Sequence, residues 1–307
     1  MYLISELLRE YFADRDLKPS TQQAYGVAAR ALIRQMGDCL MEEIDRKKIL
    51  AWRKEVLRVT LKEISWNTYI RELKGLYQFG IDRGLISLQQ NPFQECNVRC
   101  PKRPSKTVQS DVMSNARHLL ANMEREEIEW QQWTEFYPAW FWRTVFETFA
   151  YTGMRANEVI CLRLDDIDLH KRMIRIRAEV AKTHEERWIP IHETLHPYMS
   201  RLVYAAKKKK IASGEQLFNL NVYSVRHMKP NTNMDQIGAF YKKLSAKLGV
   251  AISPHRFRHT LASRLMKEPD RDIHTVKELL GHRNISTTMK YISVDFEQMR
   301  ELLNEMR

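Results

Sequence analysis

The first part of the chain carries apolar and polar positions in the spacing of amphipathic helices. Apolar side chains recur at intervals of three and four over residues 3–12 and again over residues 70–81. Strand signals are nearly absent, and Gly84 followed by Asn91-Pro92-Phe93 marks the end of the last helix. The pattern predicts a bundle of four or five helices, one of which begins at Pro19-Ser20-Thr21 with a hydroxyl side chain as its N-cap.

A different pattern, strict alternation of apolar and polar residues, occurs twice further along. Residues 173–177 read Met-Ile-Arg-Ile-Arg and residues 187–191 read Arg-Trp-Ile-Pro-Ile. Alternation of this kind predicts two strands of a small antiparallel sheet. Lys182 then lies in the turn between them.

Residues 129–149 are dense in aromatic side chains, most of them at helical spacing. Aromatic residues interleaved with basic ones can stack on nucleic acid bases, but this spacing favours a packed pair of helices.

Gly153 breaks one helix shortly before another begins, and this places Arg155 at a helix start. Backbone N–H groups at such a position also favour an anion. Glu158 lies on the same helical face, from which it can orient Arg155 or a neighbouring histidine.

The net charge of the chain is +12 and its pI is near 9.5. Such an excess favours a polyanionic partner. Nucleic acid fits better than an anionic membrane, because the basic residues are dispersed through segments that look folded and do not flank an apolar anchor.

Other features favour a protein of the cytoplasm. Residues 1–10 contain acidic residues within their apolar run, which is typical of an amphipathic helix and not of a signal peptide. No apolar stretch reaches the roughly 18 residues that a membrane span needs. The four cysteines show neither a disulfide framework nor zinc-site spacing, which favours reduced thiols.

A basic run broken by prolines, residues 99–106, separates two helical regions and predicts a linker. We therefore expect a helical domain over residues 1–97, a basic linker over 98–108, and a second domain over 109–307. Two domains joined by a basic tether can close around a duplex.

The candidate chemistry lies near the end of the chain. Tyr291 supplies a phenol that can attack phosphorus, and Arg258 supplies a planar fork that matches phosphate oxygens. His255 and His282 can hold or move protons near neutral pH. These are parts of a phosphoryl-transfer site, which needs a second arginine and a proton donor from upstream.

Arg155 and Lys182 are the upstream candidates. Taken in order, the set resembles the tyrosine recombinase, or phage integrase, family: Arg155, Lys182, His255, Arg258, Gly281-His282 and Tyr291. The resemblance implies a mainly α fold with a small antiparallel β-sheet. It also implies a two-domain, C-shaped DNA clamp: a helical, SAM-like core-binding domain followed by a catalytic domain that ends in a helix.

The resemblance further implies cutting and rejoining of DNA strands through a 3′-phosphotyrosyl intermediate. Tyr291 attacks the scissile phosphate and a 5′-hydroxyl leaves. Arg155 and Arg258 neutralise the nonbridging oxygens, and Lys182 protonates the 5′-oxygen. The turn around Lys182 departs from the usual glycine-rich basic turn of the family, because two glutamates follow it.

His255 is the expected general base and His282 the expected donor to the phosphate, although the two roles can be exchanged. No nucleotide or metal is expected. His255 and His259 have the spacing of a helical metal pair, but no glutamate follows His255 as in a metalloprotease motif.

The family resemblance implies double-stranded DNA as partner and self-association to a tetramer in synapsis. Residues 294–306 look like an amphipathic helix that packs on its own core or on a neighbouring protomer. The length is typical of Xer-type or integron-type recombinases that integrate, excise, invert or resolve a mobile element. Which of these outcomes applies, and which accessory proteins take part, is left open.

Two other functions fit part of the pattern. A type IB topoisomerase has similar active-site chemistry but relaxes DNA without exchanging strands. A noncatalytic DNA-binding regulator would keep the fold alone. The complete residue set argues against the regulator, and the Gly281-His282 box and helical N-terminal half favour a recombinase over the topoisomerase.

Overall fold

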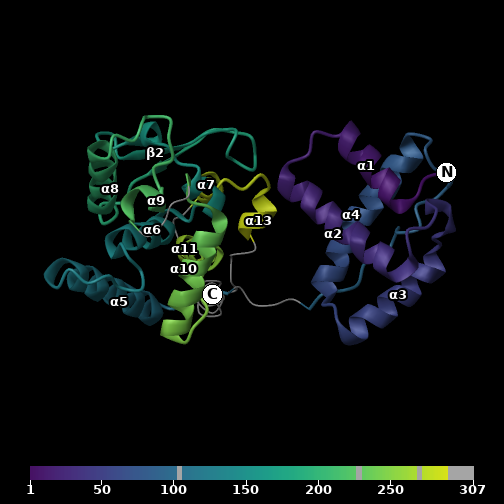
Figure 1. The fold of residues 1–307 in the computed structure, drawn as a ribbon, viewed down its shortest axis with the longest axis horizontal. Coiled ribbons are helices and arrows are strands. Elements are labelled where there is room, and N and C mark those ends of the chain that lie inside the picture. Colours follow the sequence, from purple (N-terminus) through teal and green to yellow (C-terminus); the bar gives the residue numbers. More distant parts are fainter. Residues whose placement is uncertain (102–105, 226–229, 268–271, 290–307) are drawn as a thin grey trace, which may run out of the picture. The chain divides into compact units, whose positions relative to one another are not determined.

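The structure is a computed structural model, and it describes residues 1–101, 106–225, 230–267 and 272–289. The chain divides into an N-terminal unit, Met1–Arg103, and a C-terminal unit, Pro104–Arg307 (Figure 1). No helix in the described residues is both long enough and apolar enough to cross a membrane.

The N-terminal unit is a helical bundle, as the apolar spacing predicts. Its described residues form a 3-10 turn, η1 (Met41–Glu43), and four α-helices: α1 (Ile4–Asp14), α2 (Pro19–Met36), α3 (Arg46–Val59) and α4 (Glu63–Asp82). The helices bury one apolar core, in which Trp66, Tyr77 and Phe93 are fully enclosed. The Asn-Pro-Phe triplet therefore contributes Phe93 to the core beyond the end of α4.

The start of α2 differs from the prediction. Lys18 occupies the N-cap position, no side chain caps the helix, and Pro19 is its first residue. Proline suits this position because its fixed φ matches the helix and its missing N–H would have no partner there. The hydroxyl cap predicted from Ser20 or Thr21 is wrong for that reason.

The C-terminal unit is also mainly helical. Its described helices are α5 (Ser110–Glu129), α6 (Ala139–Thr152), α7 (Ala156–Ile160), η2 (Leu164–Asp166), α8 (His196–Lys208), α9 (Leu220–Tyr223), α10 (Met234–Leu248), α11 (Pro254–Leu265), α12 (Ile273–Leu280) and α13 (Ile285–Met289). Helix α6 contacts α5, α8 and α11.

A small antiparallel sheet completes this unit. Strands β1 (Ile167–Asp168), β2 (Met173–Ile176) and β3 (Arg187–Pro190) lie in the order β1-β2-β3. Ile174 pairs with Ile189, and both are buried. The predicted fold class, mainly α with a small antiparallel sheet, is confirmed. Strand β1 was not predicted, since two residues are too short for alternation to show.

Aromatic side chains of α6 pack into the core of the C-terminal unit. Trp142 stacks on Phe240 of α10 with ring centroids 4.4 Å apart, and Phe146 meets Phe257 of α11 edge-on at 5.0 Å. The predicted packing role is therefore confirmed for α6. Residues 130–133 differ, because Trp130 and Trp133 are 63% and 55% exposed.

Candidate active site

Arg155 lies in the short connection between α6 and α7. Gly153 ends α6 with a φ of +58°, a conformation that glycine adopts without a steric penalty. Two residues later Arg155 is the N-cap of α7, which confirms its predicted place at a helix start. The left-handed backbone at Gly153 thus sets the position from which the side chain of Arg155 extends.

Glu158 holds Arg155 from the first turn of α7. One carboxylate oxygen accepts from Nη1 of Arg155 at 2.9 Å, and the other accepts from its backbone N–H at 2.9 Å and from Nη2 of Arg187 at 2.8 Å. Glu158 is 1% exposed, and this burial alone would raise its pKa. The hydrogen bonds and charges of Arg187 and Arg155 outweigh burial and lower the pKa of Glu158, so the carboxylate stays ionised.

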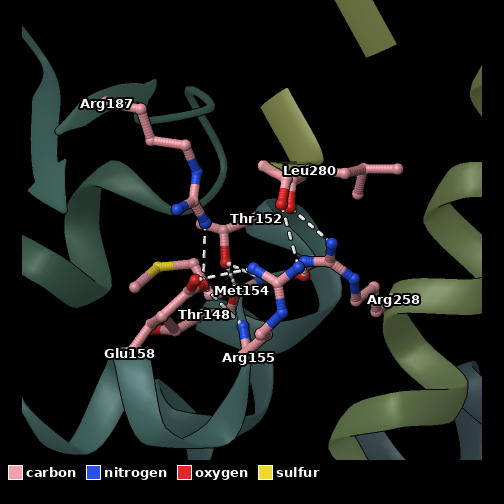
Figure 2. Close-up of polar contacts among 10 residues, drawn as sticks. Thr148, Thr152, Met154, Arg155, Glu158, Arg187, Arg258 and Leu280 are labelled. Atoms are coloured by element: carbon pink, nitrogen blue, oxygen red, sulfur yellow. Dashed lines mark hydrogen bonds and ion pairs between the residues drawn. The ribbon is translucent and has the colours of Figure 1, made fainter. Parts of the chain in front are cut away.

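Arg258 comes from the middle of α11. Ser253 caps this helix by accepting from the backbone N–H of Arg256, and Pro254 is its first residue. Arg258 is 4% exposed and donates from Nη1 to the carbonyl oxygen of Gly153 at 2.9 Å and from Nη2 to that of Leu280. Figure 2 shows Arg155 and Arg258 approaching from separate segments.

The end of α12 receives both arginines. Gly281 ends this helix with a φ of +61°, and its carbonyl oxygen accepts from Nη2 of Arg155 at 2.9 Å. The last carbonyls of a helix lack partners within the helix and carry partial negative charge. Guanidinium groups satisfy both needs, so the sequence Leu280-Gly281 anchors Arg155 and Arg258 side by side.

His282 follows directly and is buried, with Nδ1 2.8 Å from Oγ1 of Thr288. Burial and the positive charges of Arg258, Arg155 and Arg187 lower the pKa of His282 to about 4. The imidazole is therefore neutral at pH 7. If the hydroxyl of Thr288 donates to Nδ1, the remaining N–H at Nε2 is a hydrogen-bond donor.

His255 lies one turn before Arg258 on α11. Burial, Arg258 and Arg155 lower the pKa of His255, which leaves it neutral and able to accept a proton near pH 7. Its Nε2 lies 2.8 Å from Nε2 of His259. Within the described residues no three side chains of His, Cys, Asp or Glu converge as metal ligands would.

The structure brings together Arg155, Arg258 and His282 through direct contacts or shared backbone groups, with His255 beside them. Lys182 is exposed in the turn between β2 and β3, and among the described residues no hydrogen bond or ion pair joins it to the arginines. Tyr291, together with residues 294–306, lies outside the described residues.

Arg187, the first residue of β3, belongs to this site and was missed by the sequence reasoning. The alternation of residues 187–191 places Arg187 on the same side of the strand as buried Ile189. A charged residue at an inward position is a signal that could have found it.

Two guanidinium groups, those of Arg155 and Arg187, thus share the carboxylate of Glu158, and together with Arg258 they place positive charge near the neutral imidazole of His282. The excess positive charge is partly buried and fixed by hydrogen bonds before any ligand arrives. Such an arrangement suits an anion with several oxygens, of which phosphate is the plain example.

Comparison with known proteins identifies the family. A sequence model described as the phage integrase family matches residues 118–298, more than half of the chain. The chain belongs to this family. The resemblance expected from the ordered residues is confirmed.

Curated relatives in the family include two Pseudomonas proteins that both carry the name "Putative tyrosine recombinase XerC". The P. syringae protein is 43% identical over 303 residues, covering 98% of this chain and 64% of its own length. The P. aeruginosa protein is 41% identical, covering 97% of this chain and 70% of its own length. The chain thus spans about two thirds of the length of these relatives.

Solved structures of two integrases share the fold of this chain at low sequence identity. The Tn1549 transposon integrase in complex with transposon right end DNA has a TM-score of 0.75 at 17% identity and covers 99% of both chains. A lambda integrase tetramer bound to a Holliday junction has a TM-score of 0.68 at 18% identity, covering 95% of this chain and 77% of that one.

Proposed function

We propose that this protein is a site-specific DNA recombinase that cuts and rejoins strands through a 3′-phosphotyrosyl intermediate. The observation that carries the proposal is the anchoring of Arg155 and Arg258 on consecutive carbonyls, Gly281 and Leu280, beside His282. A phosphodiester undergoing substitution gains negative charge on its nonbridging oxygens. Guanidinium groups that are already oriented stabilise that charge without reorganising during the reaction.

Tyr291 is the proposed nucleophile, and its phenol oxygen forms the bond to phosphorus while the bond to the 5′-oxygen breaks. Arg155 and Arg258 bind the nonbridging oxygens. Lys182 donates a proton to the departing 5′-oxygen. Lys182 is exposed on the β2–β3 turn, where it is accessible to DNA.

The two histidines have separate proposed roles. His255 takes the phenolic proton, which its neutral state permits. His282 donates a hydrogen bond to the phosphate, and its pKa of about 4 keeps it a neutral donor over the whole physiological range. The reaction calls for no nucleotide or metal, because the phosphotyrosyl bond retains the energy of the phosphodiester that was broken.

Double-stranded DNA is the proposed substrate, and a tetramer is the proposed active assembly. The net charge of +12 supports the first. The similar solved structures support the DNA substrate and the tetramer. The Tn1549 integrase was solved with DNA, and the lambda integrase was solved as a tetramer bound to a Holliday junction. We assign residues 1–97 to core binding, 98–108 to the linker and 109–307 to catalysis, and we place the activity in the cytoplasm.

Covalent trapping tests this function. The protein is incubated with nicked duplexes tiled across the DNA that flanks its gene, and SDS-resistant complexes are digested to map the attached residue. We expect an adduct at Tyr291 in the wild type and none in Tyr291→Phe, which should bind the same DNA equally well. An adduct that persists in Tyr291→Phe, or tight wild-type binding with no adduct on any duplex, would overturn the proposal.

A further inference from the structure

Arg187 is buried in an unusual way for an arginine. Its side chain is 9% exposed and donates from Nη2 to Glu158 at 2.8 Å. Its Nε and Nη1 are also buried, and neither has an acceptor among the described residues. Buried donors without partners cost free energy, so packing alone gives no reason to place a guanidinium group here.

The guanidinium group lies directly against Gly281. A Cβ atom added to Gly281 would stand 2.8 Å from Cζ of Arg187 and 2.9 Å from its Nε and Nη1. A side chain at position 281 would force the guanidinium group of Arg187 to shift, so this placement of Arg187 depends on glycine at that position. Gly281 thus serves two needs, its φ of +61° and the close approach of Arg187.

These contacts close a ring of four residues. Arg187 binds one oxygen of Glu158, and the other oxygen binds Arg155. Arg155 in turn binds the carbonyl oxygen of Gly281, against which Arg187 packs. Figure 2 shows the shared carboxylate between the two arginines. The ring holds both Nη1 and Nη2 of Arg155. A shift of any one of the four residues would therefore move the guanidinium group of Arg155.

We propose that Arg187 is a positioning residue for strand cleavage, which fixes Arg155 through Glu158 and fixes the Gly281-His282 turn by packing. It stands at the start of β3, where the turn that carries Lys182 ends. One side chain thereby connects that hairpin to the anion site. This inference rests on the proposed function and adds a residue to it.

A purely structural role would affect stability alone, whereas a positioning role predicts a split between binding and cleavage. Arg187→Met removes the fork, and we expect single-turnover cleavage of a nicked duplex to slow about 10²-fold, the order of loss that a misplaced group produces. DNA affinity should change less than about twofold, because the phosphate contacts along the duplex remain. Arg187→Lys keeps the charge without the fork and should recover only part of the rate.

The histidine signals of the protein alone give a second readout. Arg187 is one of the charges that lower the pKa of His282. In Arg187→Met the NMR titration midpoint of His282 should therefore rise, whereas in Arg187→Lys it should stay close to wild type. The signal is assigned by its loss in His282→Asn.

Arg175→Met is the matched control, since Arg175 lies on the neighbouring strand, pairs with Asp166 and takes no part in the ring. It should leave the cleavage rate and the His282 titration unchanged. Wild-type cleavage by Arg187→Met, or by Arg187→Lys if the first variant does not fold, would overturn the inference while the proposed function stands. An absent adduct in the wild type would overturn both.

Discussion

Arg155 and Arg258 donate to the carbonyl oxygens of neighbouring residues, Gly281 and Leu280, although they come from different helices. The C-terminal end of α12 therefore holds the two guanidinium groups as a pair of carboxylates could, but it adds no formal negative charge. Partial charges on the helix carbonyls orient the two guanidinium groups, and Glu158 supplies the carboxylate that pairs with Arg155. This matters for a site that is proposed to bind a phosphodiester.

Glu158 is the single carboxylate in the ring, and its removal should be costly. In Glu158→Gln the amide cannot neutralise Arg155 and Arg187, which stay partly or fully buried. We expect the free energy of unfolding of the C-terminal unit to fall by about 3–5 kcal/mol, the usual effect of breaking a buried ion pair. Urea unfolding followed through the buried tryptophan of α6 measures this.

The control for that change is Glu179→Gln. Glu179 also binds an arginine, Arg177, but its side chain is 63% exposed and Asp166 holds the same arginine. Its replacement should alter the unfolding free energy by less than about 0.5 kcal/mol. Equal effects of the two variants would contradict the special status of Glu158.

Gly153 offers a test of how tightly the arginine anchors pack. An alanine Cβ there would lie 3.0 Å from Cδ2 of Leu261 and 3.2 Å from that of Leu280, at a φ of +58°. Gly249 has a similar φ, +64°, with no atom within 4 Å. Gly249→Ala should cost about 1–2 kcal/mol from backbone strain alone. Gly153→Ala should cost roughly 1–3 kcal/mol more because of crowding.

The difference between those two alanine variants is the quantity of interest, and thermal unfolding of both under one buffer gives it. If Gly153→Ala were no worse than Gly249→Ala, the junction of α6, α11 and α12 would be looser than its contacts indicate.

Local patterns in the sequence predicted much of this structure. Alternation located β2 and β3 within one residue, and the glycine at 153 located the end of α6. The order of the arginine and histidine motifs pointed to Arg155, Arg258 and His282, which meet at the C-terminal end of α12. Each of these signals is local or depends on residue type, which is why a single sequence reveals them.

Contacts between residues far apart in the sequence could not be predicted from such local patterns. Arg187 binds Glu158 from 29 positions further along the chain, and no spacing rule connects a strand start to a helix start. Glu158 was expected to orient Arg155, but the sequence did not show that a second arginine shares it. Nor could the sequence show that helix carbonyls, in place of side chains, hold Arg155 and Arg258.

The buried state of His282 predicts a loss of stability in acid. The unfolded chain protonates this histidine near pH 6.5, whereas the folded chain does so only near a pKa of about 4. Between these values the unfolded state binds more protons, so stability is full above pH 6.5 and falls as the pH drops toward 4. The contribution is about 3 kcal/mol over that interval.

His282→Asn should flatten the pH dependence by this amount. The pKa values of His255 and His259 are also lowered, but both remain in wild type and variant, so the difference in slope reports His282. Urea unfolding at several pH values between 4 and 7 supplies the slopes. Parallel curves would show that His282 is protonated in the folded protein as readily as in the unfolded chain.

Lys182 is the proposed proton donor, and its role is separable from DNA binding. Lys182→Ala should slow strand cleavage by about 10² to 10⁴-fold while DNA affinity stays nearly constant. A duplex whose leaving 5′-oxygen is replaced by sulfur needs no such proton, because a thiolate leaves readily by itself. On that duplex Lys182→Ala should cleave at close to the wild-type rate. Lys171→Ala, at an exposed lysine in the preceding turn, is the matched control and should cleave both duplexes normally. A defect in Lys182→Ala that sulfur does not relieve would assign Lys182 to binding or positioning in place of proton transfer.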